Sequence, residues 1–121
     1  MKITATQIRY LLSIYQLCKN GVVRSSDIAD SLEVSRPSAH RMVDQLLKMN
    51  LIVKEQHSCI RFTEESRELA EQYYKGFLHI SRFLHECFVL PKDTAEDGAL
   101  TILSGLTITK VKELCMRMNE C

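Results

Sequence analysis

Residues 25–48 read SSDIADSLEVSRPSAHRMVDQLLK, and this stretch decides the fold. Apolar residues at helical spacing predict a short helix over 27–32 and a longer one over 36–49. Ser35 can cap the longer helix, and Pro37 lies in its first turn, where the missing N–H costs nothing. Two helices joined by so short a turn predict a helix-turn-helix.

The elements on either side of this stretch complete a winged domain. An apolar stripe at helical spacing predicts a further helix over residues 6–19. The β-rich run 51–53 and the alternating run 59–62 flank a polar stretch, which is typical of a two-stranded hairpin. The order of helices and hairpin predicts a winged helix-turn-helix DNA-binding domain over residues 1–62.

The remainder, residues 63–121, is predicted to be a helical dimerisation domain. A long helix should run from Thr63 towards Pro91, and two shorter helices should follow it. Apolar side chains along the long helix are spaced as in a coiled-coil seam, and we expect a partner chain to cover them. This seam consists of Tyr73, Phe77, Ile80, Leu84 and Cys87. The predicted fold class is therefore mainly α with a small β wing.

The net charge of +1 on the 121 residues is an average over two unlike halves. Residues 1–62 carry nine Lys or Arg against five Asp or Glu, which gives +4. Residues 63–121 carry seven against ten, which gives −3. The basic half is therefore the part expected to meet a polyanion.

The polar side of the 36–49 helix supplies the candidate DNA contacts. In a helix-turn-helix the first turns of the second helix reach base edges in the major groove, where arginine pairs with guanine or phosphate. Basic residues of the hairpin are expected to contact the DNA backbone. The predicted DNA-binding residues are Ser35, Arg36, Pro37, Ser38, His40, Arg41, Lys54 and Arg61. A protein-interaction module built on the same winged helix is the alternative.

The chain resembles the diphtheria-toxin-repressor and manganese-regulator (DtxR/MntR-like) family. The similar motifs are RYLLSIYQL at 9–17, SDIADSL at 26–32, S-x-P-S at 35–38 and FTE at 62–64. The resemblance implies a homodimeric winged-helix repressor that binds double-stranded DNA at a palindromic operator, and in which Mn(II) or Fe(II) enables binding. It places the DNA-reading positions on Ser35, Arg36, Pro37, Ser38, His40 and Arg41.

The metal site that the family implies is not retained in this sequence. The family's ligand positions fall on Arg9, Leu12, Phe77, Asp97, Leu100 and Thr101. Of these, Asp97 alone is a ligand that Mn(II) or Fe(II) would use. We expect a buried Arg9 to fill the place of the metal, and therefore no metal cofactor. A substitute site that includes His79 and Glu86 is the open alternative.

The five cysteines, at 18, 59, 87, 115 and 121, contain no C-x-x-C pair and indicate reduced thiols. Cys59 has His57 and Arg61 within two residues of it, so it is the candidate for a redox-sensitive thiol. A regulator that responds to thiol oxidation or to a small molecule is therefore a second alternative.

Several other classes of protein are excluded by what the sequence lacks. A phosphate-binding glycine loop, a nucleophile elbow and an H-E-x-x-H motif are all absent, so no enzyme activity is expected. No run of about 18 apolar residues could cross a membrane, and the first residues lack an apolar signal core. The expected location is cytoplasmic.

Overall fold

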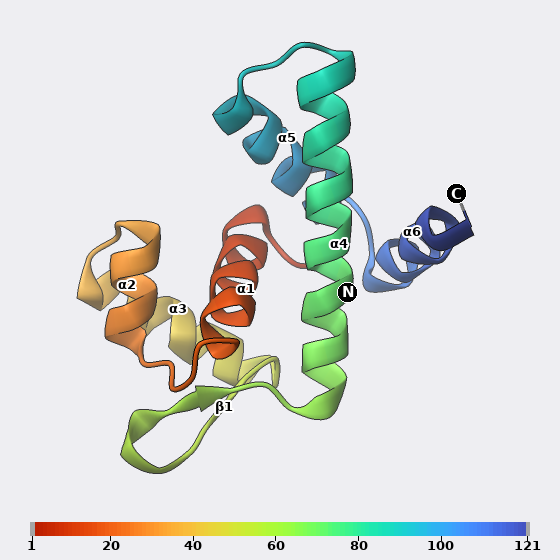
Figure 1. The fold of residues 1–121 in the computed structure, drawn as a ribbon. Coiled ribbons are helices and arrows are strands. Elements are labelled where there is room, and N and C mark those ends of the chain that lie inside the picture. Colours follow the sequence, from red (N-terminus) through yellow and green to blue (C-terminus); the bar gives the residue numbers. More distant parts are fainter. Residues whose placement is uncertain (1, 121) are drawn as a thin grey trace. The chain divides into compact units, whose positions relative to one another are not determined.

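The computed structural model describes residues 2–120, with side chains over residues 2–118, and the chain divides into two compact units (Figure 1). One unit, here called the wing unit, consists of residues 10–70. The other, the helical unit, consists of residues up to 9 together with those from 71 onward. The functional division into residues 1–62 and 63–121 stays a prediction.

The wing unit has the predicted order of elements, and the winged helix-turn-helix is confirmed. Its elements are α1 (Ala5–Cys18, which begins in the helical unit), α2 (Ser25–Leu32), α3 (Arg36–Lys48), β1 (Val53–Lys54), the short 3-10 helix η1 (Gln56–Ser58) and β2 (Ile60–Arg61). The strands are shorter than the apolar runs that predicted them.

The turn between α2 and α3 is closed by the backbone. Glu33 has a left-handed conformation, with φ of 56°, and the Val34 N–H donates to the carbonyl oxygen of Ala29 at 3.0 Å. A left-handed residue is a common way to end a helix, although glycine adopts it at lower cost. The turn lets α2 and α3 pack through small and branched side chains that are all at most 2% exposed: Ile28, Ala29, Ala39, Val43 and Leu46.

The wing is an antiparallel hairpin that is joined to a third segment by a single β-bridge. Val53 pairs with Arg61, and Lys54 pairs with Ile60. The Ile60 N–H also donates to the carbonyl oxygen of Val23 at 2.8 Å, in a bridge that joins β2 to the segment between α1 and α2. The base of the wing is therefore anchored to the segment that follows α1.

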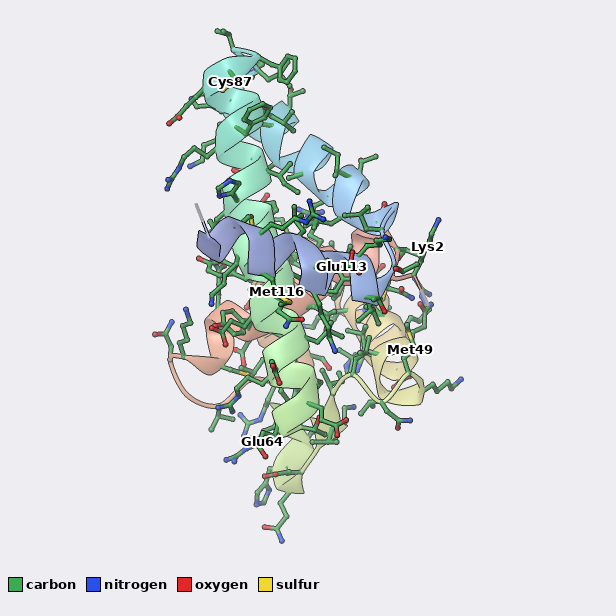
Figure 2. All side chains as sticks on the ribbon, turned by 90° about the vertical axis from the view of Figure 1, so that its right-hand side faces the viewer. Lys2, Met49, Glu64, Cys87, Glu113 and Met116 are labelled. Atoms are coloured by element: carbon green, nitrogen blue, oxygen red, sulfur yellow. The ribbon has the colours of Figure 1, made fainter. Side chains whose placement is uncertain are left out.

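The helices after the wing are α4 (Glu64–Cys87), α5 (Lys92–Ser104) and α6 (Ile108–Glu120). Thr63 caps α4 as predicted, because its hydroxyl accepts from the Ser66 N–H at 3.1 Å. In the helical unit, α6 lies against α4 (Figure 2). The Cys115 thiol, on α6, donates to the carbonyl oxygen of Gln72, on α4, at 3.1 Å.

Two glycines allow α4 and α5 to approach each other closely. A Cβ atom at Gly76 would lie 3.1 Å from Leu103, and one at Gly98 would lie 3.0 Å from Leu84. Both distances are too short for an ordinary carbon contact. The predicted seam therefore faces partly into its own chain, since Leu84 already packs against α5.

The predicted dimerisation residues consequently have unequal exposure, and the prediction for Tyr73 is wrong. Its side chain is fully buried within its own chain and has no surface left for a partner. Phe77, Ile80 and Leu84 are half-buried, and Cys87 is exposed. The shorter helices α5 and α6 occupy part of the surface that a partner was expected to cover. No helix within residues 2–120 is long and apolar enough to span a membrane.

Candidate DNA-binding surface

The first turn of α3 is held by its own polar side chains. The Ser35 hydroxyl accepts from the Ser38 N–H at 3.2 Å, and the two side-chain hydroxyls lie 2.9 Å apart. This cap is the one predicted from the sequence, and it satisfies one of the free amides at the start of the helix.

The predicted base-contacting residues lie on the outer side of α3. Ser35, Arg36, Pro37, His40 and Arg41 are exposed, and Ser38 is half-buried. Arg41 donates to the Ser38 hydroxyl at 3.3 Å, so its guanidinium is held over the first turn. The Arg36 side chain has no hydrogen-bond or ion-pair partner among residues 2–118, and it is free to meet an external acceptor.

One further residue on this side of α3 was missed from the sequence. Gln45 is exposed and follows Arg41 by one helical turn. A glutamine can pair with the N6 and N7 groups of adenine, so it belongs with the candidate contacts. Its four-residue spacing from Arg41 is the signal that could have identified it.

The wing carries two of the predicted contacts. Lys54 and Arg61 are both exposed, on β1 and β2 respectively. Arg61 forms an ion pair with Glu55, with 3.3 Å between Nε and a carboxylate oxygen. Exposed pairs of this kind stabilise a protein by at most about 1 kcal/mol, so a DNA phosphate can compete for Arg61.

The tip of the wing is tied back to the helix-turn-helix. The Arg24 guanidinium, at the start of α2, donates to the carbonyl oxygen of His57 at 3.3 Å. His57 and Ser58 both have left-handed backbone angles, with φ of 61° and 59°. Two consecutive non-glycine residues in this region make a strained tip, which the contact from Arg24 helps to hold.

Manganese or iron does not fit the positions that the family would use. Leu12 and Leu100 are buried hydrocarbon side chains, and Phe77 is half-buried, so none of the three offers a ligand atom. The Thr101 hydroxyl donates to the backbone of Asp97 at 3.0 Å, and the Asp97 side chain is exposed.

The expectation of a buried Arg9 is wrong, because this side chain is exposed. It lies outside the stripe of Ile8, Leu11 and Leu12 that α1 buries. The substitute site at His79 and Glu86 gains no support. Within residues 2–118, no three His, Cys, Asp or Glu side chains come together in a group that could hold a metal ion.

Comparison with known proteins connects this geometry to transcriptional regulators. The MarR family model matches residues 3–58, slightly less than half of the chain. No curated protein matches the sequence. Solved structures of metal-dependent regulators match nearly the whole chain.

The manganese regulator SloR is 24% identical with a TM-score of 0.75, and the match covers 98% of this chain and 55% of that one. The metal-dependent transcriptional regulator MtsR is 18% identical with a TM-score of 0.72, covering 93% and 53%. IdeR of T. acidophilum is 18% identical with a TM-score of 0.64, covering 98% and 56%.

The chain thus spans about half the length of the solved regulators that it matches. At these identities the likeness establishes the fold. The chain has the winged-helix fold seen in these solved metal-dependent regulators, and residues 3–58 are also similar to the MarR family model.

Proposed function

We propose that this chain is a DNA-binding transcriptional regulator that acts as a homodimeric repressor on a palindromic operator. The observation that carries the proposal is the outer side of α3. There a capped first turn presents two exposed arginines within a winged helix-turn-helix. Similarity to the MarR family model and to solved regulators supports the same class of protein.

Direct contact with DNA would divide between α3 and the wing. Arg36, His40 and Arg41 would meet base edges in the major groove, since the N-terminal turns of the second helix have this role in helix-turn-helix proteins. Lys54 and Arg61 would meet phosphates beside that groove. Phosphate contacts position the protein on the duplex, and base contacts provide the specificity.

The proposed dimer uses the exposed end of α4. Phe83 and Phe88 are 52% and 64% exposed, and their rings meet edge to face with 5.7 Å between centroids. Val89 beside them is 82% exposed. Large apolar side chains gathered at a surface favour contact with another protein chain. We therefore include this end of α4, with Cys87, in the proposed dimer surface, and Phe77, Ile80 and Leu84 contribute their remaining exposed parts.

The proposed regulator does not need Mn(II) or Fe(II) to bind DNA. The six positions that the family would use supply one carboxylate and one hydroxyl, whereas these ions need several nitrogen or oxygen ligands around one point.

An in vitro selection tests the proposal. The purified chain is used to retain duplexes from a random pool, and the retained sequences are read. We expect an enriched palindrome whose half-sites lie about 34 Å apart, one turn of the duplex, because a two-fold symmetric dimer presents two α3 helices. Failure to enrich any sequence, with binding that does not change with salt, would instead favour a winged-helix protein-interaction module.

A further inference from the structure

Two cysteines that are far apart in the sequence line one cavity of the wing unit. Cys18 is the last residue of α1, and Cys59 directly precedes β2. The cavity has a volume of about 300 Å³. Its remaining lining consists of Gly21, Val22, Ile60, Phe62 and two arginines, Arg61 and Arg67.

The fold brings the two cysteines to this one cavity. The bridge from the Ile60 N–H to the Val23 carbonyl, at 2.8 Å, joins the start of β2 to the segment that leaves α1. Cys59 immediately precedes Ile60, and the segment from Cys18 to Val23 is short. Gly21 allows this segment to turn, with φ of 122° that other residues rarely adopt.

The surroundings of the two thiols differ in a way that suits two roles. Burial raises the pKa of Cys18, although the nearby Arg67 and Arg61 guanidinium groups act in the opposite direction. Cys18 therefore keeps its proton more readily than an ordinary thiol, and it is half-buried. Cys59 is half-buried on the hairpin, two residues from Arg61. Partly exposed thiols beside cationic groups are the ones that oxidants reach.

We propose that Cys18 and Cys59 are an oxidation switch that closes to an intramolecular disulfide in response to hydrogen peroxide. The Cys59 thiolate attacks one oxygen of the peroxide, the O–O bond breaks, and the departing hydroxide takes up a proton to form water. Cys59 is left as a sulfenic acid, the first step of cysteine oxidation.

Cys18 completes the reaction. Its sulfur attacks the sulfur of the Cys59 sulfenic acid, the S–S bond forms and the S–O bond breaks. The departing hydroxide takes the proton that the Cys18 thiol releases and forms a second water. In total, two thiols lose two electrons and two protons, and the peroxide is reduced to water.

A disulfide at this place would tie the wing covalently to α1. It holds the two Cα atoms about 4.4–6.8 Å apart, so it fixes the start of β2 to the end of α1. Lys54 pairs with Ile60 and Val53 pairs with Arg61, which means that both wing cations follow any shift of β2. The effect on DNA rests on the proposed function, whereas the disulfide itself does not.

The first test measures the chemistry on the full chain. The reduced protein is treated with stoichiometric hydrogen peroxide and then mapped by mass spectrometry without reduction. We expect one linked peptide that contains Cys18 and Cys59, and free thiols that fall from the five in the sequence to three. Cys18→Ser and Cys59→Ser should each abolish the linked peptide, with circular dichroism to show that each variant is folded. Cys18→Ala provides a second variant at the α1 position.

The matched control is Cys115→Ser. Cys115 is buried in the helical unit, and a serine there keeps a donor for the carbonyl oxygen of Gln72. This variant should still form the linked peptide. Linkage through other cysteines, or conversion of Cys59 to sulfinic acid with Cys18 still free, would overturn the proposal.

The second test measures the consequence for DNA. The oxidised protein should bind the selected duplex at least about tenfold more weakly than the reduced protein, and dithiothreitol should restore binding, because the wing cations contribute to affinity. A disulfide that leaves the affinity unchanged overturns the switch. If the reduced chain binds no duplex, the proposed function fails, and the peptide map still decides whether the disulfide forms.

Discussion

Replacing Arg41 by alanine should weaken specific DNA binding without affecting the fold. Arg41 is exposed on α3, and the one hydrogen bond of its side chain within the described residues, to the Ser38 hydroxyl, is 3.3 Å long. Arginine and alanine both favour helices, so the change costs little stability. A lost pair with a guanine costs about 1–3 kcal/mol, which corresponds to a 5- to 150-fold higher Kd. Arg36→Ala should behave in the same way.

The assay is fluorescence anisotropy with the duplex selected by the wild-type protein and with a scrambled duplex of equal length. Lys112→Ala is the matched control, since it removes one exposed positive charge from α6. If Arg41 contacts a base, its variant loses affinity for the selected duplex and little for the scrambled one. If both arginine variants bind the selected duplex as tightly as the Lys112→Ala protein, the assignment of α3 to the major groove is refuted.

Four further predictions concern the wing, the dimer surface and the packing. Lys54→Ala should weaken binding to all duplexes alike and lower the slope of log K against log salt by about 0.9, measured in a salt titration. Phe83→Asp should give a monomer in sedimentation velocity, because the ring is 52% exposed and its loss leaves the core intact. Tyr73→Phe should leave the free energy of unfolding unchanged or raise it by about 1 kcal/mol in a urea titration, since the buried hydroxyl has no partner among the described residues. Glu33→Gly should raise the free energy of unfolding by about 1 kcal/mol, because glycine adopts the left-handed φ of 56° without strain.

The burial of the Tyr73 hydroxyl also predicts that stability depends on pH. Burial raises the pKa of its hydroxyl to about 12 from its ordinary value of 10. The unfolded state ionises first, so this contribution is fully present below pH 10 and is lost as the pH rises from 10 to 12. The Tyr73→Phe protein should lose less stability over that range.

Each of the four grouped predictions has an outcome that contradicts it. A Lys54 variant with an unchanged salt slope removes the wing from the phosphate contacts. A Phe83→Asp protein that sediments as a dimer excludes the exposed end of α4 from the interface. Marked destabilisation by Tyr73→Phe would mean that the Tyr73 hydroxyl has a hydrogen-bond partner in solution. A Glu33→Gly protein that is less stable than the wild type would mean that the turn needs the Glu33 side chain.

The parts of the fold that follow local rules could be predicted from the sequence. Ser35 caps α3 and Thr63 caps α4 as expected, because capping depends on residues only three positions apart. The exposure of Arg36 and Arg41 followed from the position of the apolar stripe on the same helix. Their contact with DNA stays a prediction.

The parts that depend on packing between distant elements could not be predicted in the same way. The stripe on α4 correctly identified apolar residues, but nothing in its spacing shows that α5 and α6 cover some of them. Tyr73 was therefore assigned to a partner although its own chain buries it. The shared cavity of Cys18 and Cys59 was missed for the same reason, since it depends on the bridge between Val23 and Ile60.

The most direct test of the account is a mobility shift of the selected duplex by the reduced protein, with Mn(II), with Fe(II) and with a chelator. The account predicts the same affinity in all three conditions, because the positions that the family uses for metal hold arginine, leucine and phenylalanine among their residues. Binding that appears with Mn(II) and is lost with the chelator would contradict it.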